Sequence, residues 1–144
     1  MWRWLTLCLA AFVLAAVVYE LVPLPITPPL LRGASAGGGW WDACIEQDYD
    51  KGKYGQLAIS PQFNQRLKDQ FPPGTPESAL VSVLLDQGFH MQVPCKSDTS
   101  IRSASFEQRG GSLFYLPAYA VAAWKVDAQG NLLWTRGHVA YTGP

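Results

Sequence analysis

A continuous apolar run near the N-terminus, residues 4–22, constrains this chain more than any other feature of its sequence. The nineteen residues carry one charge, Glu20, and are otherwise rich in Leu, Ala and Val. A helix rises about 1.5 Å per residue, so a run of this length just crosses the ~30 Å hydrocarbon core of a bilayer. The sequence therefore predicts a transmembrane anchor, or an uncleaved signal, over residues 1–22.

Two fates of this segment stay open. In the first, the segment is retained as a single-pass anchor, and Arg3 on its short N-terminal side favours export of the C-terminal part. In the second, a peptidase cuts after the A-x-A-like sequence that ends at Ala36, which leaves a periplasmic or secreted product. The length of the apolar run and the Pro-rich spacer behind it favour retention.

Residues 23–39 have the composition of a linker, first Pro-rich and then Gly-rich. We expect this linker to hold one domain, residues 40–144, away from the membrane surface. From Gly33 onward the chain carries nine Lys and Arg against ten Asp and Glu, a net charge of about −1. Nucleic-acid binding needs clustered basic residues, so this balance argues against that class of partner.

Three cysteines are present, and Cys8 lies inside the apolar run. The other two, Cys44 and Cys95, are an even count in an exported domain, where disulfides persist. We therefore expect a disulfide between them, and two buried free thiols are the alternative. Two distant cysteines and two scattered histidines are too few for a zinc site, so we expect no metal and no cofactor.

Two short helices are expected in tandem. Ser60 is a good N-cap, Pro61 suits the first helical position, and an apolar stripe recurs every four residues at Phe63, Leu67 and Phe71. A second start follows at Thr75, Pro76 and Glu77, and Gly88 is placed to end that helix. The expected buried face of the second helix is Leu80, Val81, Leu84 and Leu85.

Strands are expected in the second half of the chain, at residues 91–95, 101–108, 112–126 and 132–141, with a hairpin loop at 127–131. The longest strand alternates, which puts Phe114, Leu116, Ala118, Ala120, Ala122, Trp124 and Val126 on one face, and Pro117 marks an edge or a bulge. An antiparallel sheet of this size needs one covered face, and the two helices are the available cover. The predicted class is α+β, a two-layer sandwich of two short helices on a three- to four-stranded antiparallel sheet.

The order of these elements resembles the BamE-like (SmpA/OmlA) domain of small outer-membrane-assembly lipoproteins. The similarity covers about residues 60–141 and includes the Gly74-Thr75 start of the second helix, its end at Gly88, and the hairpin that follows Trp124. The family is anchored by a lipid on an N-terminal cysteine, which this chain lacks. The resemblance therefore implies a small envelope domain that binds other proteins, here held by an apolar helix in the bacterial inner membrane.

Catalysis has few candidate residues in this sequence. Only His90 and His138 could act as neutral bases near pH 7, and no nucleophile motif such as G-x-S-x-G accompanies them. We expect no catalytic residues. The alternative is a periplasmic hydrolase-like enzyme that uses His90 or His138.

Binding of another envelope protein is the leading functional hypothesis, with a scaffold, assembly or inhibitor role and no chemistry of its own. An immunity-type inhibitor is a further alternative. Tryptophan often anchors protein interfaces, and the candidates are Trp40 and Trp41 at the start of the domain, followed by Trp134, Arg136 and His138 on one face of the last strand. Packing of these rings onto the domain is the alternative reading of each group.

Overall fold

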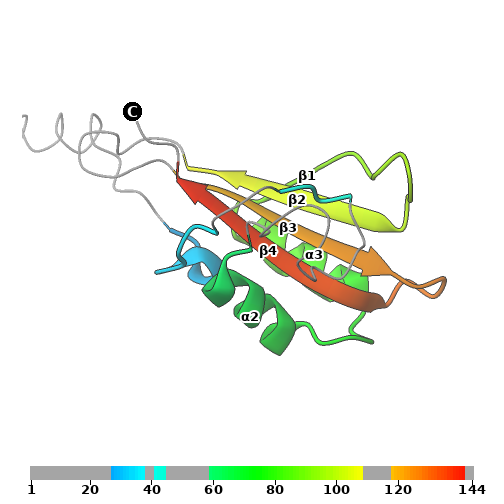
Figure 1. The fold of residues 1–144 in the computed structure, drawn as a ribbon. Helices are drawn as coiled ribbons and strands as arrows, with labels where there is room; N and C mark the ends of the chain where they lie inside the picture. The colour runs from blue at the N-terminus through cyan, green and yellow to red at the C-terminus, as the bar shows by residue number, and fades with distance from the viewer. Residues whose placement is uncertain (1–26, 38–40, 45–58, 109–117, 142–144) are drawn as a thin grey trace, which may run out of the picture.

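The structure is a computed structural model that describes residues 27–37, 41–44, 59–108 and 118–141 (Figure 1). Two helices lie on one face of a four-stranded antiparallel sheet, which confirms the α+β prediction. After a short 3-10 helix, η1, the elements follow the predicted order: η1 (Pro29–Leu31), α2 (Pro61–Gln70), α3 (Glu77–Asp86), β1 (His90–Met91), β2 (Ile101–Glu107), β3 (Ala118–Val126) and β4 (Leu132–Tyr141).

The expected anchor, residues 4–22, lies outside the described residues. Within the described ranges, no helix is long and apolar enough to cross a membrane.

α2 begins at the predicted proline, and α3 begins at Glu77, one residue after the predicted Pro76, which is its N-cap. Pro61 is the first residue of α2, and the apolar stripe of this helix, with the Phe71 that follows it, is buried. Gly88, with φ at +83°, ends α3, because a residue without Cβ adopts that angle at little cost. One detail differs: Ser60 makes no side-chain cap, and its buried hydroxyl has no hydrogen-bond partner among the described residues.

The sheet runs β1-β2-β3-β4, and each strand pairs antiparallel with the next. Strand β4 has the predicted bounds, and the turn before it is closed by Asp127, whose Oδ1 accepts the N–H groups of Gln129 and Asn131. Strand β1 is only two residues long. The described part of the third predicted strand begins at Ala118, so Phe114, Leu116 and Pro117 lie outside the described residues.

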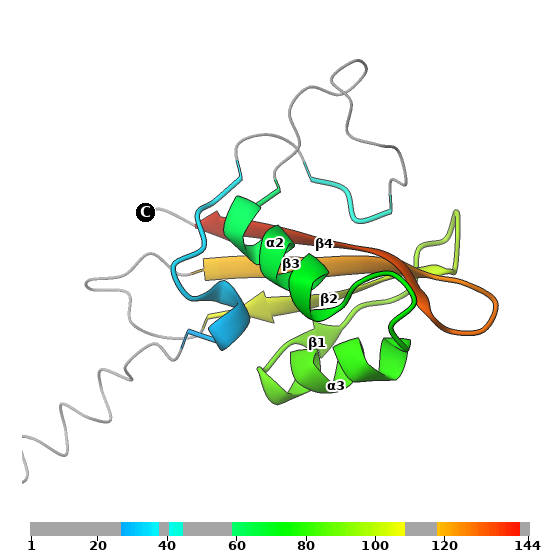
Figure 2. The ribbon, with the colours of Figure 1, turned by 90° about the horizontal axis from the view of Figure 1, so that it is seen from below.

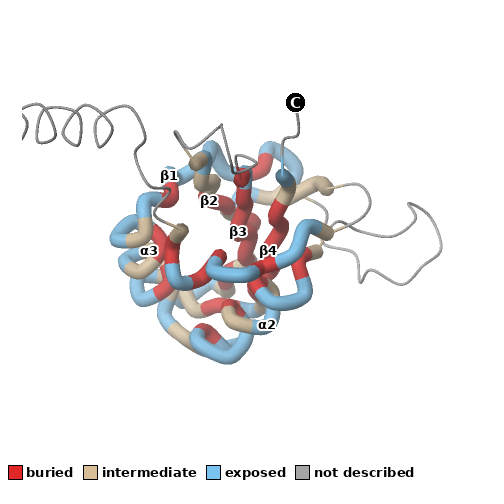
Figure 3. The backbone as a smooth tube through the Cα atoms, turned by 90° about the vertical axis from the view of Figure 1, so that its left-hand side faces the viewer, coloured by how far each residue is buried: buried red, intermediate tan, exposed pale blue. Residues whose placement is uncertain are grey.

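The core lies between the helices and one face of the sheet. Viewed from the helix side, α2 crosses β3 and β4, and α3 lies beside β1 and β2 (Figure 2). Alternate residues of β3 belong to the core beneath the helices, as predicted. Buried positions follow β3 and β4 through the centre of the domain (Figure 3), whereas both residues of β1 are exposed. The core side chains from the helices and the sheet include Phe63, Leu67, Leu80, Leu84, Ala104, Ala120, Ala122, Trp124, Val126 and Val139.

Leu85 corrects the predicted face of α3. It was expected in the core with Leu80 and Leu84, which are fully buried, but half of its surface is exposed. A helix that touches the sheet along one stripe buries residues four apart, and Leu85 lies one position beyond that stripe.

The predicted linker also needs correction. Leu30 and Leu31 of η1, and Ala34 after it, belong to the main hydrophobic core. Residues 28–34 are therefore part of the folded domain, and the expected start of that domain at residue 40 is wrong. The Pro-rich and Gly-rich composition indicated a linker, although it includes the apolar pair Leu30 and Leu31, which packs next to the helices.

The free edge of β4 is covered by other parts of the chain. The N–H groups of Ser60 and Gly37 donate to the carbonyls of Gly137 and Val139, at 2.9 and 3.3 Å. At the other end of the strand, the Gly74 N–H donates to the Leu132 carbonyl at 2.7 Å. These bonds occupy backbone acceptors that an edge strand would otherwise present to another chain.

Candidate functional site

The predicted binding residues lie on the outer face of the sheet, opposite the helices. Cross-strand partners share a face, so the register places Trp134, Arg136 and His138 in successive rows of this face, beside Lys125, Ala123 and Val121 of β3. Trp41 stacks on His138, with ring centroids 4.9 Å apart and planes inclined by 14°. Trp40 lies outside the described residues.

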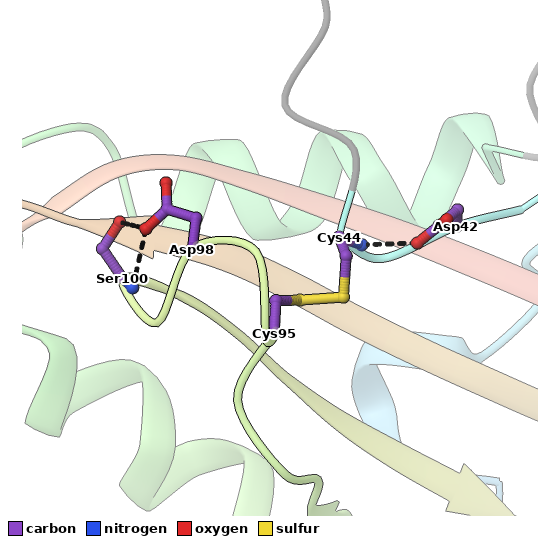
Figure 4. The surroundings of a disulfide bond; sticks show 5 residues. All are labelled: Asp42, Cys44, Cys95, Asp98 and Ser100. Carbon is purple, nitrogen blue, oxygen red and sulfur yellow. Dashed lines mark hydrogen bonds between the residues drawn. A yellow bond between two sulfur atoms is a disulfide. The ribbon is translucent and has the colours of Figure 1, made fainter.

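A disulfide ties the segment that carries Trp41 to the sheet. Cys44 and Cys95 are joined, with their Cα atoms 5.5 Å apart, as the sequence predicts (Figure 4). Cys95 is buried, and its N–H donates to the Ile101 carbonyl at the start of β2. The disulfide and the Trp41 ring are thus two attachment points that hold residues 41–44 against the outer face.

The loop between Cys95 and β2 is fixed by a carboxylate. Asp98 accepts hydrogen bonds from the Ser100 hydroxyl and N–H, at 2.5 and 2.9 Å (Figure 4). Its Oδ2 lies 3.1 Å from the Lys125 ammonium. The Ser100 hydrogen bonds, helped by the charge of Lys125, lower the pKa of Asp98 below its usual value. In the β3–β4 turn, the N–H of Asn131 has the same effect on the pKa of Asp127.

Trp134 and Arg136 form a second pair on this face. The Arg136 guanidinium lies 4.0 Å from the centre of the Trp134 ring, which is cation–π geometry. Arg136 and His138 are both buried, and the Trp134 indole nitrogen is buried without a hydrogen-bond partner in the described part of the chain. The face is therefore covered in this structure, so Arg136 and His138 are not presented to solvent as an open patch.

His90 and His138, the residues of the enzyme alternative, share one cross-strand row but lie on the two outermost strands. His90 pairs with Ser105, Ser105 with Val121, and Val121 with His138. Two strands separate the histidines, so they cannot act on one substrate atom together. In the described ranges, no three His, Cys, Asp or Glu side chains are grouped so that they could hold a metal ion.

A second polar cluster lies on the face of the sheet that the helices cover. It was not predicted from the sequence. Glu77, the first residue of α3, accepts the Trp124 indole N–H at 2.7 Å through Oε1, and its Oε2 accepts a hydrogen bond from Arg102. Glu77 thereby joins α3 to β2 and β3. The sequence signal was only the acidic residue in the first turn, which equally suits the helix dipole.

We expect Glu77→Ala to lower the free energy of unfolding by about 2 kcal/mol, because it leaves a buried indole N–H and Arg102 without their acceptor. Glu77→Gln keeps one acceptor oxygen and should cost less. Urea unfolding measures both, with Glu107→Ala at an exposed position as the control. Equal midpoints for Glu77→Ala and Glu107→Ala would show that Glu77 does not join the layers.

A groove lies where η1 meets the two helices. Its volume is about 430 Å³, and Pro29, Leu30, Arg66, Asp69, Gln70 and Gln87 line it. The Arg66 guanidinium donates to the Leu30 carbonyl at 2.9 Å, and the Gln87 side-chain oxygen accepts the Leu30 N–H at 3.0 Å. Two of the lining side chains are therefore already used to hold η1 in place.

Among the described residues, none donates or accepts a backbone hydrogen bond on the outer side of β1, unlike at the β4 edge. Gln92 donates its N–H to the Ser103 carbonyl, and in an antiparallel register this directs the backbone groups of Met91 and Val93 away from β2. The Val93 side chain is 84% exposed and that of Met91 42% exposed. An exposed apolar edge whose backbone groups have no hydrogen-bond partner in the described part of the chain is suited to pairing with another strand.

No protein-family model, curated protein or solved structure matches this chain.

Proposed function

We propose that this is a membrane-anchored envelope protein whose periplasmic domain binds another envelope protein and performs no chemistry of its own. The observation that carries the proposal is the open β1 edge with Met91 and Val93. The occupant is an extended apolar segment of the partner, which adds to the sheet as a further strand. Backbone hydrogen bonds supply affinity in this binding mode, and alternate side chains supply specificity. The resemblance to BamE-like domains supports the same functional class.

The disulfide supports an oxidising compartment, because such bonds persist in exported proteins and are rare in the cytosol. Retention of residues 1–22 is supported by the core. Cleavage after Ala36 would remove Leu30, Leu31 and Ala34, which are all at most 3% exposed. Because the folded domain includes these residues, a retained anchor agrees better with the packing than a cleaved signal.

The matched positions Val93 and Leu133 test the binding proposal. Both side chains are exposed and apolar, but Leu133 lies on β4, at the other side of the sheet. We expect Val93→Lys to weaken the complex at least tenfold, because a charge on the edge opposes strand addition, and Leu133→Lys to leave it unchanged. A photo-crosslinking residue at position 93 in the full-length protein, in cells, should give one discrete product that mass spectrometry identifies.

The crosslink at position 133 is the negative control. Equal crosslinking at positions 93 and 133, or equal losses for the two lysine variants, would refute the β1 edge as the binding site. Circular dichroism of each variant checks that the fold is intact.

A further inference from the structure

The segment between the apolar run and the folded domain is much shorter than the sequence indicates. The backbone of η1 is held by Arg66 and Gln87, and the Gln62 side-chain oxygen accepts hydrogen bonds from the Ser35 N–H and hydroxyl. The Tyr141 hydroxyl donates to the Ala34 carbonyl. Residues 28–37 are thus attached to α2, α3 and β4, and only residues 23–27 remain as a tether.

A tether of five residues has a small maximum reach. At about 3.5 Å per residue, the six steps from Val22 to Pro28 span at most ~21 Å at full extension, and two of the five tether residues are the stiff Pro23 and Pro25. If residues 4–22 are the anchor of the proposed function, on which this inference rests, Pro28 must stay within that distance of the end of the anchor. The domain therefore cannot turn its η1 side away from the bilayer.

The surface beside η1 has the composition expected next to lipid headgroups. Tyr119 and Tyr141 lie at this end of β3 and β4, on opposite faces of the sheet, and each is about two-fifths exposed. Leu85 is exposed two residues before Gln87, which binds η1. Tyrosine rings and apolar side chains favour the membrane interface.

Charges of both signs surround this surface. Arg32, Asp86 and Glu107 are exposed there, so the surface gives no preference for anionic lipid. The opposite end of the domain, one strand length or about 33 Å away, carries the polar β3–β4 turn with Ala128 and Gln129 exposed.

We propose that the η1 end, which we define as η1 with Leu85, Tyr119 and Tyr141, rests on the phospholipid headgroups of the membrane that holds residues 4–22. The occupant of this surface is the bilayer itself. The β1 edge is then held within a few tens of ångströms of the membrane. The partner that adds a strand there must present its segment close to the same membrane, as an integral membrane protein or a neighbouring anchored domain does.

Fluorescence quenching on the full-length protein tests this orientation. A fluorophore is attached through a bio-orthogonal residue at Glu107, near the η1 end, or at Gln129 in the distant turn, since both side chains are exposed. The protein is reconstituted in phosphatidylcholine vesicles that contain lipids with a quencher on the headgroup. We expect quenching at position 107 to exceed that at position 129 at least threefold.

A tether variant supplies the decisive comparison. Insertion of twenty Gly and Ser residues between Thr27 and Pro28 should bring the two quenching values close together without releasing the protein from the vesicles. Equal quenching at both positions in the unmodified chain would overturn the proposed orientation, and unchanged quenching after the insertion would overturn the short tether as its cause.

Vesicle flotation separates this inference from the proposed function. A chain that does not float with the vesicles lacks the anchor, and the proposed membrane function then fails together with this inference. A chain that floats but gives equal quenching at positions 107 and 129 keeps its anchor, and only the orientation is wrong.

Discussion

Replacing Cys44 and Cys95 together by Ser is expected to lower the free energy of unfolding by about 4 kcal/mol. The two residues are 51 positions apart, and cross-linking a loop of that length removes about this much chain entropy from the unfolded state. The loss is large beside the 5–15 kcal/mol or so that stabilises an ordinary domain. Chemical unfolding of the parent chain with and without reductant should give the same difference.

Thiol trapping checks the bond itself. Alkylation of the exported protein should leave Cys44 and Cys95 unmodified until reductant is added. A Cys8→Ser chain keeps the bonded pair and is the matched control for the loss of a thiol. Modification of both Cys44 and Cys95 without reductant would contradict the structure, and so would a Ser variant as stable as its parent.

Gly137→Val is expected to cost about 3 kcal/mol, at the upper end of the usual range for overpacking. A Cβ at this position would lie 2.5 and 2.7 Å from two ring carbons of Phe63, and 3.1 Å from the Asn64 nitrogen. Valine is normally favoured in a strand, so the sign of the effect comes from the close approach of α2 to β4. Thermal or urea unfolding measures the change.

A double-mutant cycle identifies the cause of that loss. In a Phe63→Ala background, which removes the Cγ and Cδ1 atoms that the new Cβ meets, Gly137→Ala should cost less than it does in the parent chain. Ala140→Val on the same strand, at a partly exposed position, should change stability by less than about 0.5 kcal/mol. Equal costs for Gly137→Ala in both backgrounds would show that Phe63 is not the contact.

Most of the fold follows from local signals in the sequence. The helix and strand boundaries are marked by Pro61, Gly88 and the turn at residues 127–131. These signals can be recognised in the sequence because caps and turns depend on only a few neighbouring residues. The alternation through β3 also predicts its buried face correctly, because the side-chain period of a strand is two.

The burial of residues 28–34 could not be predicted from local sequence signals. Their composition is that of a linker, and the only signal against this reading is the apolar pair Leu30 and Leu31. Whether such a pair is buried depends on a space between α2 and α3 that no local pattern describes. Tertiary packing decides it, and here packing includes the pair in the core.

For the candidate site, the sequence predicts only which residues share one face of the last strand. Alternation places Trp134, Arg136 and His138 on one face, but it does not say which face the helices cover or whether another segment covers the opposite one. The disulfide and the Trp41 ring bring residues 41–44 onto that face. The open β1 edge was missed, because residues 91–95 give a weak strand pattern interrupted by Pro94 and the edge position depends on strand order.

The two borders of the sheet differ in a way that limits how copies of this domain can associate. On β4, three backbone carbonyls accept hydrogen bonds from Ser60, Gly37 and Gly74 of the same molecule, whereas β1 has no such cover in the described residues. A continuous fibre needs two free sheet edges per molecule, and the described residues leave only the β1 edge without cover. Association of copies through exposed sheet edges would therefore stop at a pair.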